Sequence, residues 1–384
     1  VWLEIAMGMA LQHYCFTSAR QVDFDGSKTS LELLHATGNE SPTSRACRPL
    51  RPSKNLVVKV LLLVGTWWSA AVVVTLQMKS MLGKGGSFPY SFALTGLTNA
   101  LTGILACLIA RVLQIWQAPM PALQWDEIAK LTLIGAVQGL EYACNNKSLE
   151  YLSVSGRTMT SSMMVLFMML TARLWGLERL DTARVAAAAL IAAGGALQGL
   201  SVTGTAPRAE SDAYFCGVLL QLTAMLAGSQ RWALLQYVTQ RSQAGSALAF
   251  MSKSKLHLVQ RTLPVTGVTC LLLSAQFEGH KMSPGCFTDA SLFGKVSFIA
   301  SGIVALTVAE LEIVRATSAV AILVLGSLHQ IPITIAGMLF FHETVRLLSA
   351  LGFGLCLLGG LCYVKARCSE ASPAVVVSSL LHTE

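Results

Sequence analysis

Apolar runs of helical length follow one another along most of this chain, separated by short polar or proline-containing segments. A helix needs about 20 apolar residues to cross the hydrocarbon core of a bilayer. Pro89, Pro119 and Pro284 fall between runs, as helix-breaking residues should. The pattern predicts an all-α integral membrane protein with about ten transmembrane helices. The expected spans are residues 56–77, 90–113, 127–146, 153–176, 182–203, 213–238, 256–276, 291–311, 317–341 and 345–366.

One sequence pattern occurs twice, once in each half of this series. Each copy begins with Leu-Glu, continues to a second Glu, and reaches a Gly-Gly pair sixteen residues after that Glu. The residues are Leu149, Glu150, Glu178, Gly194 and Gly195 in one copy and Leu311, Glu312, Glu343, Gly359 and Gly360 in the other. A membrane chain built from two related halves is typical of secondary transporters, whose substrate site lies between the halves.

Lysine and arginine are unevenly distributed between the two sides of the predicted bundle. With the N-terminal tail in the cytosol, sixteen lie on the cytosolic side and seven on the other. This bias predicts that both termini are cytosolic, so that two five-helix halves have inverted orientations. The predicted organisation is a flexible tail at 1–55, a first five-helix repeat at 56–203, a linker at 204–212, a second repeat at 213–368 and a C-terminal tail at 369–384.

Composition supports the membrane class and excludes several others. Charged residues make up 12% of the chain, against about 25% in soluble domains. The net charge of +8 resides in short loops and not on one soluble face, so we expect the lipid bilayer and not nucleic acid as the partner. The ten cysteines form no Cys-x-x-Cys pair and no cluster with histidine, so neither a metal site nor a disulfide framework is expected.

No enzyme motif is present, and no cofactor is expected. The chain has no Walker loop, no His-Glu-x-x-His and no Gly-x-Ser-x-Gly sequence. No polar segment is long enough to form a nucleotide-binding domain, which an ATP-driven pump would need. Transport driven by gradients or by exchange is the remaining interpretation.

Polar residues inside predicted spans are candidates for a substrate site, because an ionisable group there normally faces a cavity or a partner. Arg231 in the sixth span, with Gln236 after it, could bind an anion, or it could snorkel to the membrane surface. In the fourth span, Arg157 shares one side of the helix with Ser161, a pairing that suits a sugar or phosphate. The alternative for such hydroxyls is interhelical hydrogen bonding.

His329 and Gln330 lie in the middle of the ninth span, just before Pro332. The histidine could bind phosphate, carry a proton or hydrogen-bond a neighbouring helix. Three glutamates near span ends are expected instead to cap helices or to pair with basic residues. They are Glu278, Glu310 and Glu343.

Four stretches together resemble the drug/metabolite transporter superfamily. They are Lys79 with Phe88-Pro89; Asn146-Lys147-Ser148-Leu149 through Tyr151 to Val154-Ser155 and Thr158-Met159-Thr160; Arg231-Trp232 with Leu235, Gln236 and Phe277-Glu278-Gly279; and Glu310 with Val314, Thr317-Ser318 and Gly326. Within the superfamily they are most similar to the triose-phosphate translocator and nucleotide-sugar transporter members, especially the GDP-fucose-transporter-like branch of solute carrier family 35.

This resemblance implies ten helices in two inverted five-helix repeats around a central cavity. It also implies antiport of a phosphorylated sugar or nucleotide-sugar against phosphate or a nucleoside monophosphate. Sugar-phosphate members carry a lysine in the fourth span and a Lys-Arg or Lys-Glu pair in the ninth. Here those positions hold Ser161 and His329-Gln330, so Arg157 and Arg231 are the cations that could compensate.

The leading hypothesis is therefore an antiporter of a nucleotide-sugar or sugar phosphate in the Golgi or the endoplasmic reticulum. Its substrate-binding residues would be Arg157, Ser161, Arg231, Gln236, His329 and Gln330. One alternative is a proton-coupled carrier of drugs or metabolites, suggested by His329 and the absent lysines. Another is a non-transporting membrane regulator on the same fold. The oligomeric state stays open, with a homodimer among the alternatives.

Overall fold

A computed structural model describes most of the chain between Lys54 and Glu370. Helices form nearly all of this part, and no strand occurs in it. Residues 1–53 and 371–384 of the two predicted tails, and Glu178, fall outside the described residues, whereas residues 54–55 and 369–370 are helical. The structure describes residues 54–82, 86–114, 124–176, 181–203, 208–241, 255–282, 290–316, 325–326 and 328–370.

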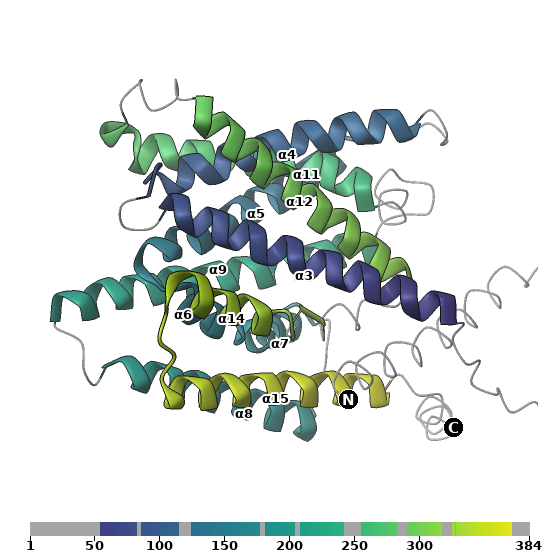
Figure 1. The fold of residues 1–384 in the computed structure, drawn as a ribbon. Helices are drawn as coiled ribbons and strands as arrows, with labels where there is room; N and C mark the ends of the chain where they lie inside the picture. The colour runs from purple at the N-terminus through teal and green to yellow at the C-terminus, as the bar shows by residue number, and fades with distance from the viewer. Residues whose placement is uncertain are drawn as a thin grey trace, which may run out of the picture.

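Eight long helices lie over eight of the predicted spans, with ends that differ by several residues (Figure 1). The agreement follows from hydropathy, because backbone amides in lipid must be satisfied within the helix. These helices are α3 (Lys54–Leu82), α4 (Ser91–Gln114), α5 (Trp125–Tyr151), α8 (Thr182–Thr203), α9 (Arg208–Arg241), α11 (Lys255–Phe277), α12 (Ala290–Ala316) and α15 (Leu347–Glu370).

The fourth predicted span, 153–176, is not one helix. It divides into α6 (Val154–Ser161) and α7 (Met164–Leu174). The Ser162 hydroxyl donates to the Met159 carbonyl, so a side chain competes for the backbone acceptor where the helix stops. The prediction of a continuous helix here was wrong, because periodicity does not register such local competition.

The ninth predicted span, 317–341, is also interrupted, within the part that the structure describes. A turn at His329 precedes α14 (Gln330–Phe341). Pro332 then falls in the first turn of α14, where a missing backbone N–H costs little. Broken helices at membrane depth are tolerated where protein or a cavity surrounds them, so both breaks mark the interior of the bundle.

The described helices define an all-α integral membrane protein. Five of them are long and apolar enough to cross a membrane, namely parts of α3, α4, α8, α12 and α15. Large apolar side chains such as Leu62, Leu272 and Phe340 point outward, as a lipid-facing surface requires. The number of ten spans and the two repeats stay predictions.

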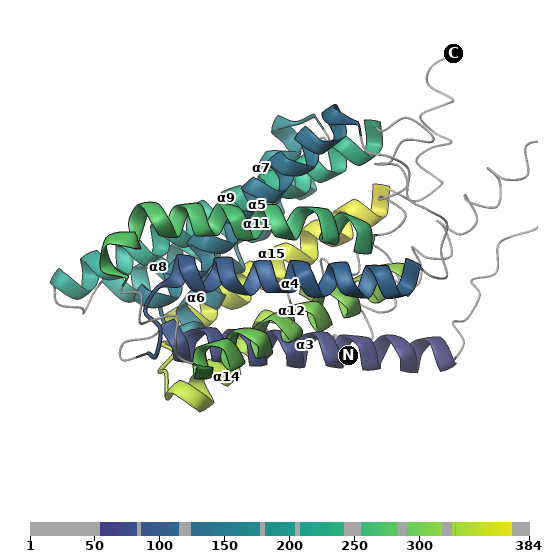
Figure 2. The same ribbon diagram turned by 90° about the horizontal axis from the view of Figure 1, so that it is seen from above.

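Helices from before residue 204 pack mainly against helices from after residue 207. The pairs are α3 with α12, α4 with α11, α5 with α9, α6 with α14 and α8 with α15. Figures 1 and 2 show α8 and α15 side by side along one face of the bundle. The two parts of the chain are therefore interleaved and share one interior.

Glycines allow the closest of these crossings. A Cβ on Gly194 of α8 would lie 2.5 Å from the carbonyl oxygen of Gly352 on α15, and a Cβ on Gly359 would lie 2.6 Å from Ile191. Small residues permit such contact where lipid supplies no hydrophobic drive for association. One glycine of each recurring Gly-Gly pair thus serves the same α8–α15 interface.

Residues 208–212 of the linker expected at 204–212 belong to α9, which begins at Arg208.

Candidate functional site

Arg231 lies on α9 and faces Glu141 on α5. The Arg231 Nε donates to Glu141 Oε2 at 2.6 Å, and a second guanidinium nitrogen lies 3.4 Å from Oε1. The guanidinium also lies over the Trp232 ring, 4.6 Å from its centroid, and interacts electrostatically with Glu310 of α12. The charge of Arg231 is therefore balanced inside the bundle, which leaves it poorly suited to hold a substrate anion unaided.

Arg157 on α6 has a contrasting environment. It is 9% exposed, and its Nε has no hydrogen-bond partner among the described residues. None of the ion pairs found among those residues includes it. Burying a cation without a counter-ion is strongly disfavoured, so Arg157 is the candidate residue whose charge the described helices leave unbalanced.

His329 lies within electrostatic range of Arg157 at the break before α14. Its ring stacks on Trp67 of α3, with centroids 5.3 Å apart and planes 17° from parallel, and its Nδ1 contacts the Gly326 carbonyl oxygen. Gln330, the next residue, begins α14 and is half-buried. The imidazole is therefore held in one orientation, with Nε2 as the ring nitrogen that no described contact occupies.

Other polar atoms around α6 and α14 also lack a partner within the described chain. They are the hydroxyls of Thr158 and Thr334 and the indole nitrogen of Trp68. Buried polar groups are normally hydrogen-bonded, to protein or to ordered water. They belong to α6, α14 and α3, which pack against one another, so this part of the bundle has polar groups in its interior.

Ser161 belongs to a hydrogen-bond chain that links three helices. Its hydroxyl accepts from Gln221 Nε2 of α9 at 2.9 Å and donates to the Arg157 carbonyl. Gln221 Oε1 in turn accepts from the Ser148 hydroxyl of α5 at 2.8 Å. Interhelical hydrogen bonding, the alternative expected for such hydroxyls, is what the structure shows at Ser161.

The predicted residues thus fall into two groups. Arg157 and His329 interact electrostatically near the place where α3, α6 and α14 pack together, and Gln330 follows His329 in sequence. Arg231 instead pairs with Glu141 of α5. Gln236 lies on α9, but its side chain falls outside the described residues.

Two of the three glutamates near span ends, Glu278 and Glu343, cap helices as predicted. Glu278 accepts hydrogen bonds from the backbone N–H groups of Phe92 and Ala93, at the start of α4. Glu343 does the same for Val154 and Ser155, at the start of α6. We call the end of the bundle where α4 and α6 begin the capped end; it lies at the left in Figures 1 and 2.

Two lysines also act at the capped end. Lys79 donates to the carbonyl oxygens of Leu149 and Leu152, where α5 finishes. Lys147 lies 2.7 Å from Glu150 and 3.9 Å from Glu278. These cations bind protein groups, so the lysines of the motifs that resemble the transporter family are structural here.

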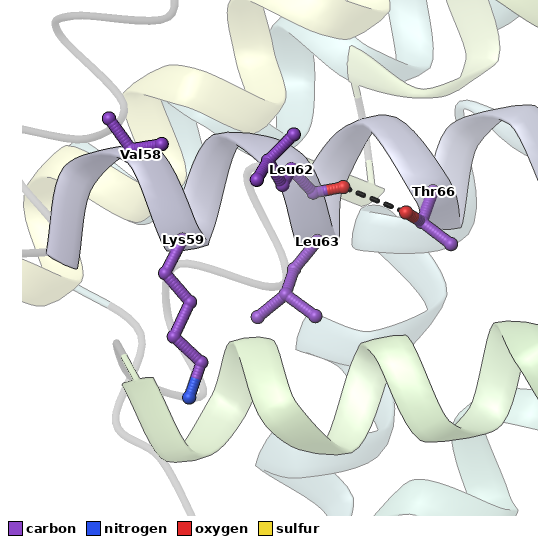
Figure 3. A pocket seen from close by; sticks show the side chains of 5 residues that line it. All are labelled: Val58, Lys59, Leu62, Leu63 and Thr66. Carbon is purple, nitrogen blue, oxygen red and sulfur yellow. Dashed lines mark hydrogen bonds between the residues drawn. The ribbon is translucent and has the colours of Figure 1, made fainter. Parts of the chain in front are cut away.

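The surface hollows on the described chain lie elsewhere. One of about 470 Å³ is lined by Val58, Lys59, Leu62, Leu63 and Thr66, all from α3 (Figure 3). A single helix forms it, and Val58 and Leu62 among its lining residues are exposed. It is a groove between outward-facing side chains, of the kind that lipid tails fill, and it includes none of the candidate residues.

Sequence reasoning missed three participants: Glu141, Trp67 and Gln221. Glu141 carried a usable signal, since it is an ionisable residue inside a predicted span, where such residues normally find a partner. Trp67 and Gln221 carried none, because their roles depend on which helix faces them. Within the described residues, no group of three or more His, Cys, Asp or Glu side chains is arranged to hold a metal ion.

Comparisons with known proteins place the chain near one named transporter. It is 22% identical to a probable sugar phosphate/phosphate translocator of Arabidopsis thaliana over 343 residues, which are 87% of this chain and 79% of that protein. No family model matches. A solved chain described only as "Crystal structure of protein" aligns with 80% of this chain and 96% of its own length, at 18% identity and a TM-score of 0.45.

Proposed function

We propose that this protein is a secondary transporter that exchanges a phosphorylated sugar across an endomembrane. The observation that carries the proposal is Arg157, a buried cation with no counter-ion among the described residues, in a broken helix of a membrane bundle. A phosphate group supplies the charge that this position lacks. The similarity to a sugar phosphate/phosphate translocator supports the same substrate class and a carrier rather than an enzyme.

In this proposal Arg157 binds the phosphate, and His329 donates or accepts a hydrogen bond at its edge. Trp67 fixes the imidazole and offers an apolar wall on which a sugar ring could lie. Ser161, Gln330 and Gln236 complete the proposed set of substrate-binding residues. Arg231 stays paired with Glu141 and helps to hold α9 against α5.

The mechanism we propose is antiport by alternating access between two inverted five-helix repeats, with both termini in the cytosol. Sealing an empty site from water would enclose Arg157 without a counter-ion, at a cost of several kcal/mol. A bound anion removes that cost, so the carrier reorients when loaded on either side. Nucleotide-sugars and sugar phosphates both meet this requirement, and the Golgi or the endoplasmic reticulum is the proposed membrane.

Counterflow in proteoliposomes tests the proposal. Purified protein is reconstituted with unlabelled nucleotide-sugar, nucleoside monophosphate, sugar phosphate or inorganic phosphate inside, and labelled substrate is added outside. We expect accumulation with a phosphorylated compound inside and none with an unphosphorylated sugar. Equal uptake with an empty lumen would contradict exchange.

A proton-coupled carrier is the second candidate, and His329 at the helix break is the observation that favours it. The same vesicles distinguish the two. Uptake that follows an imposed pH gradient and ignores internal phosphate compounds would favour the proton-coupled carrier.

A further inference from the structure

Glu343, which follows α14, accepts hydrogen bonds from backbone N–H groups at the start of the neighbouring helix α6. Its Oε1 accepts from the Val154 N–H and its Oε2 from the Ser155 N–H, both at 2.7 Å. The Ser153 hydroxyl oxygen accepts from the Gly156 N–H at 2.9 Å. The first three amides of α6, which no helical carbonyl can reach, therefore all have acceptors, two of them on one carboxylate.

The same carboxylate holds the start of α6 close to the end of α14. Glu343 follows the end of α14, and the Ser155 hydroxyl lies 3.3 Å from the Thr334 carbonyl oxygen of that helix. Gly337 makes this approach possible, since a Cβ there would lie 2.9 Å from Glu343 Oε2 and 3.0 Å from Ser155 Oγ. The two helices therefore approach closely at Thr334 and Gly337 within α14 as well as at Glu343 after its end.

Short length makes α6 dependent on this contact. It has eight residues and stops at Ser161, whereas α4, capped by Glu278 in the same way, continues for 24 residues. A short helix gains little from its own hydrogen bonds, so its position depends on tertiary contacts. Arg157 is the fourth residue of α6, three residues after Val154, and moves with the helix.

We propose that Glu343 is a positioning residue: it clasps the start of α6 to α14 and so holds Arg157 at its working distance from His329. This inference rests on the proposed function for the identity of the ligand, but the clasp itself does not. Because Arg157 lies on α6 and His329 directly precedes α14, loosening the clasp separates cation from imidazole without removing either.

Three variants of the full-length protein test the clasp. Glu343→Gln keeps the size of the side chain but loses its charge and one acceptor, and Glu343→Asp keeps the charge on a shorter side chain. The matched control is Glu127→Gln. Glu127 accepts from the Gln124 N–H at 3.0 Å and caps its own helix, α5, away from α6 and α14.

Hydrogen exchange of the protein in lipid nanodiscs gives the first readout. In Glu343→Gln we expect the peptide that contains residues 152–161 to exchange about tenfold faster, as loss of one hydrogen bond to a charged group implies. In Glu127→Gln that peptide should be unchanged. Unaltered exchange at 152–161 in Glu343→Gln would overturn the clasp, whatever the protein transports.

Binding of inorganic phosphate gives the second readout. We expect Glu343→Gln to raise the Kd about tenfold, Glu343→Asp to recover part of that loss, and Glu127→Gln to leave the Kd unchanged. Faster exchange at 152–161 with an unchanged Kd would overturn the positioning role. If the wild type binds no phosphate and exchanges no phosphorylated compound, the proposed function fails, and hydrogen exchange alone decides the clasp.

Discussion

Arg231 and Glu141 join α9 to α5 through two contacts, one of 2.6 Å and one of 3.4 Å, in a nearly buried position. Arg157 on α6 has no comparable partner among the described residues. Among the described residues, the charge of Arg231 is therefore balanced by a carboxylate and that of Arg157 is not. This difference, more than the presence of either arginine, is the reason to propose Arg157 as the anion-binding residue.

Glu141→Gln should destabilise the protein. The change leaves Arg231 buried without its counter-ion, and breaking such a pair costs about 3 kcal/mol or more. Thermal unfolding in detergent should show a clearly lower Tm. Glu312→Gln is the matched control, because its ion pair with Lys59 is long, at 3.7 Å, and more exposed. That change should cost less than about 1 kcal/mol.

The double variant Glu141→Gln with Arg231→Gln should recover much of the lost stability, since no charge is then left buried. The measurement is a double-mutant cycle on the free energy of unfolding, which isolates the interaction between the two side chains. Additive losses would mean that the pair contributes nothing beyond its separate members.

Arg157→Gln should keep or raise stability while strongly reducing exchange. Removing an unpaired buried cation relieves a desolvation cost, whereas the lost bond to phosphate lowers transport about tenfold or more. Unfolding and counterflow are measured on the same preparation. A large fall in Tm would reveal a structural partner for this arginine and would count against its role in binding.

Gly194→Ala should destabilise the α8–α15 crossing, because its new methyl group would meet the Gly352 carbonyl oxygen at 2.5 Å. Overpacking of this kind costs about 1–3 kcal/mol. Gly199→Ala, on the same helix, meets nothing within 4 Å and should stabilise α8 by up to about 1 kcal/mol. Opposite shifts in Tm for one substitution at two sites are the expected result; parallel shifts would refute the crossing.

Gln221→Leu should loosen the contact of α9 with α5 and α6. It removes the bonds to Ser148 and Ser161 and leaves both hydroxyls with one partner fewer, a loss of about 2 kcal/mol. Thr223→Val, an exposed change on the same helix, should leave the unfolding free energy nearly unaltered. Equal effects of the two changes would show that the buried chain of hydrogen bonds adds nothing.

Much of the fold was predictable because lipid imposes a simple rule on it. Every long helix covers a predicted span, since an apolar run in a bilayer has no other way to satisfy its amides. The breaks at Ser162 and His329 were not predictable from hydropathy. They depend on side-chain hydroxyls and on neighbouring helices, which leave the average hydropathy of a span unchanged.

The candidate site was also predictable only in part from the sequence. Polarity inside an apolar span was enough to single out Arg157, Arg231 and His329. Only the packing distinguished them, because it set Glu141 against Arg231 and gave Arg157 no counter-ion among the described residues. Residues 90 positions apart in the chain cannot be paired from composition alone.

By itself the sequence determined the class of protein, the course of its helices and the small set of polar residues at membrane depth. Tertiary structure decided which of those residues are already satisfied and which are not. The physical reason is that hydropathy is local, whereas the balance of a buried charge depends on every helix around it. Arg157 is a candidate for binding because of what the neighbouring helices do not provide.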